Sequence, residues 1–592
     1  MELLVKPPAA YQFIYLIPEI VLAAWGLLVL IVDFGLLRHR PAPRRRQALG
    51  WLALAGCLAV LAYLLWPGLQ EGLIGYLAGD LDLAADPDPF LFWGTLAGDA
   101  LTRAMNGVLI ALLTMVVALS MTWDFTEQWG EYFALLFWAT AGMMLLVAAE
   151  ELLLLFLTLE TMTLCLYLAT AFEKTRRRSV EGGLKYFVYG SVSSALFLFG
   201  LSLIYGLTGT TLLEGIRAAL AQRGGGPGLA GNLLGVTAVV LVLVGFGFKV
   251  AAVPFHQWAP DAYEGAPAPV TAWIAAGSKL ASFVAMMKVL VLALGPWASR
   301  ADNPLSPGWV GVVAVLAAAS MTYGNFAALG QRNFKRMLAY SSIAHAGYML
   351  VGVLAASVSY GEGEAAGAAA GSVLFYLVVY GFTTVGAFAL AAWLARDAGA
   401  DDLDDLNGLG HQHPGLAICL VVLMLSLIGM PPLAGFFGKL YMFMEALDTR
   451  DATHAVLVAL VALALLNSVV SAFYYVRVLK AMFLRPAGRV LAAATPGISW
   501  PIVGATVVAV GFGVFPAPLL DSMKGAAIPM LAPGGASQGV AGRYATRPDS
   551  AFVRPSPADE AARLEQLRRG LRPDESAPPT PPPPTPVPRP MP

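Results

Sequence analysis

Charged side chains are scarce in this sequence. Asp, Glu, Lys and Arg make up 13% of its 592 residues, while hydrophobic residues make up 58%. Soluble domains carry roughly 25% charged residues, so a water-soluble fold of this composition could not cover its surface with polar groups. The formal net charge of -1 also argues against the basic surface that nucleic-acid binding requires. The composition therefore predicts a protein that places much of its surface in lipid.

Cysteines and cofactor motifs are also few. The three cysteines, Cys57, Cys165 and Cys419, all lie in apolar runs and have neither metal-site spacing nor the pattern of a disulfide framework. They are expected to be small core residues. The sequence contains no phosphate-binding loop or dinucleotide fingerprint, and no cysteine cluster for an iron–sulfur centre. We therefore expect no cofactor and no metal in this chain, and any redox chemistry must belong to other chains.

About 14 apolar runs are long enough to cross a bilayer as helices, which takes about 20 residues each. The runs lie at 12–36, 48–66, 101–121, 131–149, 151–171, 183–207, 234–257, 268–295, 308–329, 337–356, 369–396, 415–446, 454–480 and 499–521. The first is too long for the apolar core of a secretory signal, and no small-residue cleavage site follows it, so we expect it to be the first span. The sequence predicts an all-α polytopic membrane protein.

Lysine and arginine in short loops indicate the orientation of the spans. Basic residues gather in the loops at 38–46, 174–178, 332–336 and 485–489, which fall on one side if the spans alternate. The loops at 80–88 and 362–364, on the other side, are acidic. The positive-inside rule then predicts that both termini lie outside the cytoplasm, although the acidic segment 401–405 falls inside.

The last part of the chain has a different composition. Proline dominates residues 573–592, with Pro581 to Pro584 continuous. Such a segment cannot bury enough apolar surface to offset its ordering entropy, so we predict a disordered, Pro-rich tail over 524–592.

Two spans contain prolines that should break their helices. Pro254 lies in the seventh span, and Pro431 and Pro432 lie in the twelfth. Proline removes a backbone donor and clashes one turn back, and unwound backbone in a membrane is tolerated only within protein or beside a water-filled cavity.

Both of these spans contain the pattern Gly-Phe-x-x-Lys, ending at Lys249 and Lys439, and the following spans echo each other more weakly at Ser278 to Phe283 and Ser468 to Phe473. An offset of five spans inverts the second copy, which is typical of transporters with discontinuous helices. The alternative is a chance repetition of abundant residues.

Ionisable residues lie where charge is costly. Glu160, Lys249, Lys279 and Lys439 each lie several residues from the ends of their spans. Such a residue costs at least ~2.5–3.5 kcal/mol on insertion scales and is a candidate functional group. The alternative for these four is a static ion pair.

His345 in the tenth span is a possible relay, or a neutral histidine hydrogen-bonded in the bundle, and His256 is a second possible relay. Four other cations are expected to extend towards the membrane surface: Lys185, Lys288, Arg477 and Lys480.

Lysines and a glutamate of this kind suit proton transfer. Burial and pairing shift the proton affinity of lysine and glutamate in opposite directions. A lysine that exchanges a carboxylate partner for another lysine changes its proton affinity, so it can load and release protons across a dry barrier. We therefore expect Glu160 to lie within reach of Lys249, since the fifth and seventh spans each hold one such charge.

Three long segments resemble a known family. Glu151 to Lys185, Lys249 to Val270 and Gln331 to Gly347 are similar to subunit N of bacterial NADH-quinone oxidoreductase, respiratory complex I. The resemblance covers about residues 12–521. In that family the glutamate of the fifth span and the lysines of the seventh, eighth and twelfth are the proposed proton carriers. These positions correspond to Glu160, Lys249, Lys279 and Lys439.

The resemblance also implies the organisation of the chain and its partners. It predicts helices 1–3 with an acidic outside loop over 1–130, a first antiporter-like repeat of helices 4–8 over 131–296, and an inverted second repeat over 308–483. Helix 14 follows over 499–521. The expected neighbours are subunits M, K and J and the peripheral arm. The resemblance implies that FMN, the iron–sulfur clusters and the quinone site belong to other subunits. The implied location is the bacterial inner membrane.

Three alternatives to proton pumping in complex I remain at this point. Subunits of multisubunit cation/proton antiporters and of membrane-bound hydrogenases share this fold. A non-transporting membrane scaffold, with static charge pairs, is a third.

Overall fold

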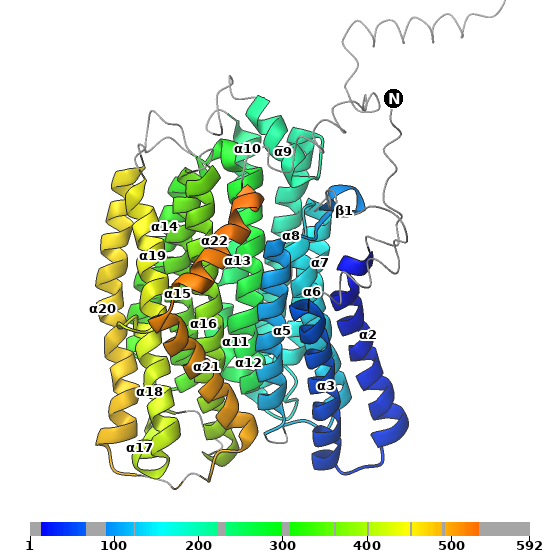
Figure 1. The fold of residues 1–592 in the computed structure, drawn as a ribbon, viewed down its shortest axis with the longest axis vertical. Coiled ribbons are helices and arrows are strands. Elements are labelled where there is room, and N and C mark those ends of the chain that lie inside the picture. Colours follow the sequence, from blue (N-terminus) through cyan, green and yellow to red (C-terminus); the bar gives the residue numbers. More distant parts are fainter. Residues whose placement is uncertain are drawn as a thin grey trace, which may run out of the picture. The chain divides into compact units, whose positions relative to one another are not determined.

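The computed structural model describes residues 13–66, 90–122, 125–222, 229, 232–298, 308–359, 363–398, 402–449, 453–487, 490 and 492–531. These residues are predominantly helical, and most of the helices run alongside one another (Figure 1). Thirteen helices in this part of the chain are long and apolar enough to cross a membrane. The shorter apolar helix α18 (Pro414–Ile428) continues after a break as α19 (Ala434–Asp448), and together they form the remaining span. The expected all-α polytopic fold is confirmed.

The N-terminal half of the described chain contains α2 (Ile17–Val32), α3 (Ala42–Leu65), α5 (Ala100–Ser120), α6 (Trp129–Ala148), α7 (Leu152–Thr170), α8 (Arg177–Thr208), α9 (Leu213–Gln222), α10 (Leu233–Val250), α11 (Trp258–Gly265), α12 (Ala268–Trp273) and α13 (Lys279–Met287). Two short antiparallel strands, β1 (Phe90–Leu91) and β2 (Leu96–Ala97), pair Phe90 with Ala97 before α5.

The C-terminal half contains α14 (Trp309–Leu329), α15 (Phe334–Val358), α16 (Gly363–Ala398), α17 (Leu409–Gln412), α18, α19, α20 (His454–Leu484), α21 (Pro496–Val514) and α22 (Ala517–Leu531).

Side-chain caps fix several helix starts. Asp99 accepts a hydrogen bond from the backbone N–H of Thr102 at the start of α5, and Asn232 and Asn333 cap α10 and α15 in the same way. A cap satisfies a backbone donor that has no partner within the helix, and residues of this kind are strongly preferred there. These polar residues therefore set where the apolar runs become helices.

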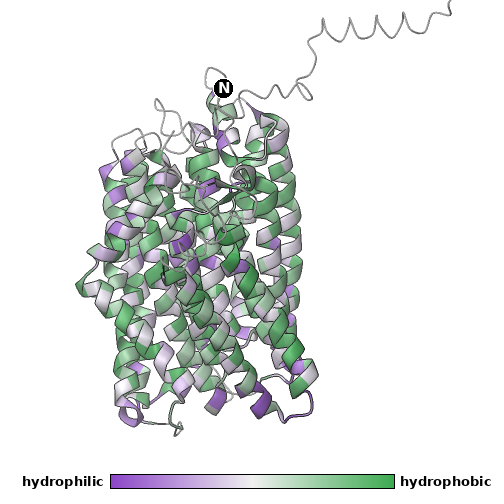
Figure 2. Ribbon diagram, turned by 45° about the vertical axis from the view of Figure 1, so that its right-hand side comes forward, coloured by the Kyte–Doolittle hydropathy of each residue, from purple (hydrophilic) through white to green (hydrophobic). Residues whose placement is uncertain are grey.

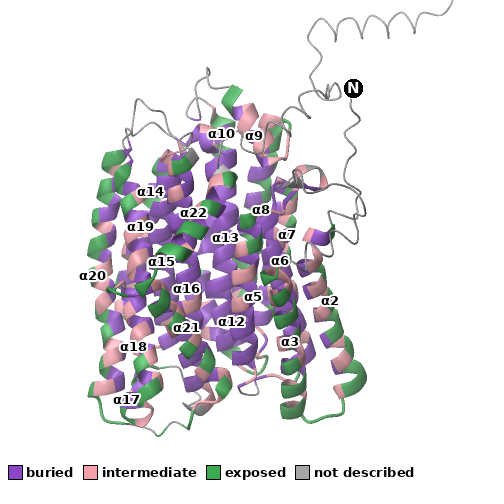
Figure 3. Cartoon of the chain, viewed as in Figure 1, coloured by how far each residue is buried: buried purple, intermediate pink, exposed green. Residues whose placement is uncertain are grey.

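Burial separates central helices from peripheral ones. Helices α12, α13, α15 and α16 are buried almost throughout, whereas α2, α3 and α20 expose apolar side chains on their outer faces (Figure 3). Exposed residues include Leu27, Trp51 and Leu466. Hydrophobic residues cover most of the length of the long helices, with hydrophilic residues at their ends and at some interior positions (Figure 2). Such outer faces suit lipid or neighbouring membrane chains.

Two spans are interrupted. Helix α10 ends at Val250, and Ala251 adopts a left-handed backbone (φ 58°) before α11 begins. Helix α18 ends at Ile428, and Gly429 is left-handed (φ 90°) before α19 begins. Pro254, Pro431 and Pro432 lie in these two non-helical segments. The broken seventh and twelfth spans predicted from the sequence are therefore present.

The eighth span has two irregular segments that the sequence did not predict. A π-helical turn over Ile274–Ser278 immediately precedes Lys279, and a second runs over Lys288–Ala293. Single π-turns inside α-helices occur frequently at functional sites, because the extra residue re-aims the following side chains.

Loops with basic residues meet on one side. Arg178 and Arg336 both pair with Glu264, at 3.0 and 3.1 Å. The backbone N–H of Leu403 donates to the carbonyl of Arg332, and Arg485 pairs with Asp404 at 2.6 Å. Three of the four basic loops therefore lie on one side, as alternating spans require. The acidic segment on that side is partly neutralised by Arg485.

The helical part of the chain extends beyond the tail boundary predicted at 524. Helix α22 continues to Leu531, and Lys524 pairs with Glu445 at 2.8 Å. It packs closely on α16, since a Cβ added at Gly371 would lie 2.6 Å from the Cα of Lys524. These tertiary contacts have no signature in composition. The prediction of a disordered tail now concerns 532–592, which lie outside the described residues, as do 80–88 of the acidic loop.

Candidate functional site

The central charges predicted from the sequence lie inside the helical bundle. Lys249 is in the last turn of α10, Lys279 begins α13, and Lys439 lies in α19. All three are buried, with exposed fractions of 6%, 2% and 5%. Glu160 lies on α7 with a partly exposed carboxylate.

Glu160 and Lys249 form an ion pair. The Lys249 Nζ lies 3.4 Å from Glu160 Oε1, so the predicted contact between the fifth and seventh spans is confirmed. Ser194 Oγ on α8 donates to the same carboxylate oxygen at 2.5 Å. The serine was not predicted, because a hydroxyl within an apolar helix carries no signal until its partner is placed.

Lys279 is held by neutral oxygens. Its Nζ donates to the carbonyl oxygen of Ser342 at 2.6 Å and to the hydroxyl of Ser342 at 2.5 Å. The ring of Tyr380 is 5.6 Å from the same nitrogen. Among the described residues no carboxylate pairs with Lys279. This lysine can therefore give up a proton without leaving an unpaired carboxylate behind.

Lys439 is held by the end of a broken helix. Its Nζ donates to the carbonyl oxygen of Ile428 at 2.9 Å and to that of Leu427 at 3.3 Å. Both carbonyls belong to the last turn of α18, where helix termination leaves acceptors without an intrahelical donor and concentrates negative partial charge. The break in the twelfth span therefore supplies the binding groups for this lysine.

One face of α15 connects the two lysines that lack a carboxylate. Ser342 binds Lys279, and the ring of Tyr348 lies 4.7 Å from Lys439 Nζ. His345 lies three residues after Ser342 and three before Tyr348. This spacing places the three side chains on one face of α15. Its ring nitrogens contact the hydroxyls of Tyr376 at 2.6 Å and Tyr475 at 3.3 Å.

His256 lies apart from this arrangement. It occupies the non-helical segment after α10, with its ring 4.6 Å from that of Tyr323. Within the described residues its Nδ1 has no hydrogen-bond partner, and no hydrogen bond or ion pair joins it to the buried lysines.

The Gly-Phe-x-x-Lys pattern does not mark equivalent positions in the two broken spans. Lys249 precedes its left-handed residue, Ala251, whereas Lys439 follows Gly429 and belongs to the next helix. The sequence echo that aligned the two lysines is therefore wrong as a structural alignment. Glycine and phenylalanine are common in this chain, so the pattern can occur twice by chance, without the same position of the lysine relative to the helix break.

A polar network adjoins Lys439. Asn325 on α14 donates to the hydroxyl of Tyr348 at 2.8 Å and accepts from that of Tyr474 at 3.0 Å. Asn467 on α20 lies 3.5 Å from the Asn325 amide nitrogen and donates to Thr322 at 3.4 Å. These neutral residues were not predicted. The sequence signal that could have indicated them was an asparagine, Asn325 or Asn467, within an apolar run.

A second buried ion pair joins the eighth span to the turn between α6 and α7. Lys288 is fully buried and pairs with Glu150 at 2.6 Å, so the expectation that it extends towards the membrane surface is wrong. Its Nζ also donates to the carbonyl of Val147 at 2.7 Å. Burial raises the pKa of the Glu150 carboxyl, while the Lys288 ammonium opposes that rise. The lysine turned inward because an acid was available in the α6–α7 turn.

No group of three or more His, Cys, Asp or Glu side chains suited to a metal ion occurs among the described residues. The described ionisable side chains form a row of separate groups: a Glu–Lys pair, a lysine on serine oxygens, a histidine between tyrosines, and a lysine on helix-end carbonyls.

Known proteins are similar to this chain in sequence and in fold. Residues 149–466 match the family described as "NADH:quinone oxidoreductase/Mrp antiporter, TM". NADH-quinone oxidoreductase subunit N of Rhodospirillum rubrum is 37% identical over 516 residues, covering 86% of this chain and 96% of the relative. F(420)H(2) dehydrogenase subunit N of Methanosarcina mazei is 37% identical, covering 87% and 99%. A chain of respiratory complex I from Thermus thermophilus is 33% identical, with a TM-score of 0.66 and coverage of 86% and 99%.

Proposed function

The chain belongs to the NADH:quinone oxidoreductase/Mrp antiporter transmembrane family, and we propose that it moves protons through its buried row of ionisable side chains. It is an antiporter-like membrane subunit of NADH-quinone oxidoreductase, of the subunit N type. Electron transfer in other subunits supplies the driving energy. The observation that carries the proposal is the Glu160–Lys249 pair, followed by two lysines held only by neutral oxygens.

Proton transfer in this row depends on changing partners. While Glu160 faces Lys249, the carboxylate stabilises the proton on the lysine. If a charge change in a neighbouring subunit draws Glu160 away, Lys249 becomes an unpaired buried cation and passes its proton towards Lys279. Helix α10 packs on α13, so the two lysines belong to adjacent elements. No described hydrogen bond joins them, and the proposal therefore requires water to carry the proton between them.

The second half of the row runs along α15. A proton leaving Lys279 meets Ser342, His345 and its two tyrosines before it reaches Lys439. His345 can accept on one nitrogen while it releases from the other, which hydroxyl partners on both nitrogens permit. His256 remains a candidate relay on a side route.

The two halves of this row correspond to the repeats proposed over 131–296 and 308–483. The helices of 1–130 precede the first repeat, helix 14 over 499–521 follows the second, and the Pro-rich tail completes the chain. We propose that both termini lie outside the cytoplasm of a bacterial inner membrane, and the basic loops that meet on one side support this orientation.

The partners follow from the family. We assign subunits M, K and J as membrane neighbours, and FMN, iron–sulfur clusters and quinone to other subunits. A relative named for F(420)H(2) dehydrogenase is similar over nearly all of its length, so we assign the choice of electron donor to those subunits as well. Gene neighbours encoding flavin and iron–sulfur subunits would separate this role from that of a cation/proton antiporter or hydrogenase subunit.

The double variant Glu160→Gln with Lys249→Met tests transport against a scaffold role. Removing one partner strands a buried charge, whereas removing both does not. A scaffold pair would tolerate the double change, but a proton carrier would not, because the protonatable groups are gone. We expect normal assembly and lowered NADH-driven proton pumping in proteoliposomes. Full pumping by an assembled double variant would refute the proposal.

A further inference from the structure

A buried carboxyl outside the lysine row has no cationic partner among the described residues. Glu19, near the start of α2, is 4% exposed, and its Oε1 accepts a hydrogen bond from Asn106 Nδ2 on α5 at 2.8 Å. Its other oxygen, Oε2, is buried without a partner. An ionised carboxylate placed here would carry an uncompensated charge in an apolar setting, which is costly.

A single added proton would give two of the unpaired atoms around Glu19 a hydrogen bond. Asn106 Oδ1 and Thr102 Oγ1 are also buried without a partner. The oxygens Oε2 and Oδ1 are both acceptors while Glu19 is ionised, so neither can satisfy the other. A proton on Oε2 turns it into a donor to Oδ1. A protonated acid and an amide can form two antiparallel hydrogen bonds, and the structure contains the one from the amide nitrogen to the acid.

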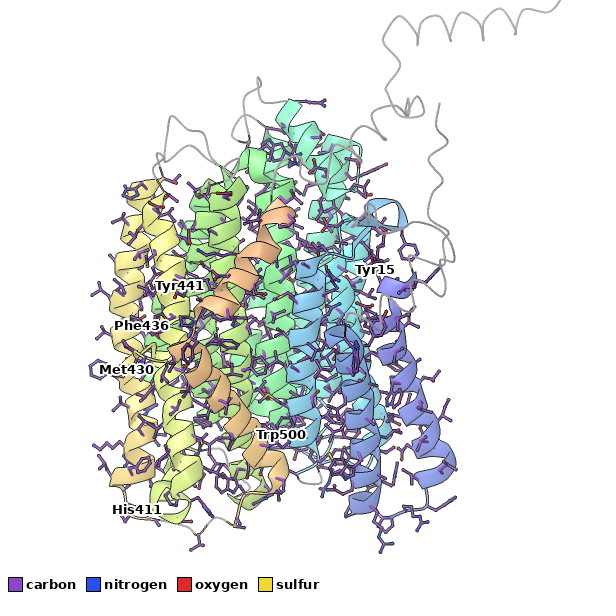
Figure 4. All side chains as sticks on the ribbon, viewed as in Figure 1. Tyr15, His411, Met430, Phe436, Tyr441 and Trp500 are labelled. Carbon is purple, nitrogen blue, oxygen red and sulfur yellow. The ribbon has the colours of Figure 1, made fainter. Side chains whose placement is uncertain are left out.

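A cavity adjoins these atoms. It has a volume of about 30 Å³ and is lined by Glu19, Asn106 and Thr102, together with Tyr15, Tyr63 and Arg103. A buried water needs about 10–15 Å³ of such volume and polar partners, so the cavity has room for roughly two waters. Tyr15 lies at the upper end of α2 (Figure 4), on the side away from the loop that joins α2 to α3. No ion pair in the described chain joins Arg103 to Glu19.

The same cavity reaches the backbone next to the Glu150–Lys288 pair, although neither Glu150 nor Lys288 lines it. Ala148 lines it, and the neighbouring Val147 provides the carbonyl that binds Lys288. The backbone N–H of Glu150 donates to the carbonyl of Thr95 at 2.9 Å, just before the Asp99 cap of α5. Lys288 lies on the same span as Lys279, beyond α13. Protonatable groups thus continue from the first repeat into the N-terminal helices.

We propose that Glu19, paired with Asn106 beside this cavity, is a proton-release site on the outer side of the membrane. This rests on the function and orientation proposed above. Uptake forms one O–H bond at Glu19 Oε2, and the charge of the carboxylate is neutralised. Release transfers that proton to water in the cavity and restores the carboxylate. The proton reaches this site from the first repeat by way of Lys288 and Glu150.

Glu19→Gln in the assembled complex tests this site. Glutamine has the shape of the neutral acid and makes the same two hydrogen bonds to Asn106, but it cannot exchange a proton. We expect normal assembly, loss of one protonated-carboxyl C=O band from infrared spectra of the purified complex, and fewer protons pumped per electron in proteoliposomes. The matched control is Glu364→Gln, which removes an exposed carboxylate at the start of α16 and should change neither readout.

Each other outcome overturns the proposal. An unchanged infrared spectrum would mean that Glu19 is ionised, and loss of the band with undiminished pumping would leave only a structural neutral acid. Failure of the glutamine variant to assemble would show that the position requires a charge. A Lys249→Met complex separates this test from the function proposed above. It should lose pumping and keep the Glu19 band. Normal pumping by Lys249→Met would refute the proton-carrying role of the buried lysines, but not the role proposed for Glu19.

Discussion

Lys439 donates a hydrogen bond to the carbonyl oxygen of Ile428, the last residue of α18, at 2.9 Å. The break that ends α18 therefore positions a lysine within α19, the next segment of the same span. The interruption is costly for a membrane helix, because it leaves backbone carbonyls without intrahelical donors. Here a protonatable side chain compensates two of those carbonyls, which couples the backbone geometry to the protonation state of Lys439.

Replacing Lys439 with arginine should separate hydrogen bonding from proton exchange. Arginine can still donate to the α18 carbonyls, but it does not release its proton in proteins. We expect an assembled complex with strongly reduced NADH-driven pumping, measured with a pH-sensitive dye in proteoliposomes. Lys524→Met is the control, because it removes a lysine paired on α22, outside the row. Normal pumping by Lys439→Arg would remove Lys439 from the proton path.

Changing His345 should interrupt transfer along α15. His345→Leu removes both ring nitrogens and leaves the hydroxyls of Tyr376 and Tyr475 without this partner. We expect a fall in pumping. The free energy of unfolding should fall by about 1–3 kcal/mol, because the Tyr376 hydroxyl loses its imidazole partner, whereas the Tyr475 hydroxyl keeps its hydrogen bond to Ser341. Tyr376→Phe serves as the comparison, since it removes one hydroxyl and keeps the imidazole. Equal pumping in His345→Leu and the unmodified complex would leave His345 a structural residue.

The Glu150–Lys288 pair should show the energetics of a buried ion pair. Lys288→Met alone strands the Glu150 carboxylate, and Glu150→Gln alone strands the ammonium, at a cost of roughly 3–5 kcal/mol each. The double variant strands neither, so we expect its thermal stability to exceed that of both single variants. The measurement is the melting temperature of the purified membrane domain. Additive losses in the double variant would mean that the two residues stabilise the protein independently.

Topology reporters should test the orientation. A reporter inserted within 174–178 is expected in the cytoplasm, because that loop lies with the other basic loops. A reporter fused at the C-terminus, or inserted within 80–90, is expected outside. A cytoplasmic C-terminal reporter would show that the number of spans is even but their orientation reversed, or that the span count is wrong.

Much of this protein was determined by the sequence alone, because lipid imposes strong local rules. Apolar runs of sufficient length fixed the spans, and Pro254, Pro431 and Pro432 predicted the two breaks. The cost of burying charge singled out Glu160, Lys249, Lys279 and Lys439 without any structure. Each of these signals is contained within one helix.

Only the tertiary structure decided what lies across from each charge. Ser194, Ser342 and the α18 carbonyls are ordinary in sequence, and they became partners because helices distant in the chain pack together. Lys288 was misjudged for the same reason, since its acid comes from the α6–α7 turn. The matching lysine motifs fell on opposite sides of their breaks, because a local pattern cannot specify register relative to another helix. The partner of each charged side chain depends on how the helices pack against one another, and that packing depends on the whole bundle rather than on any one segment.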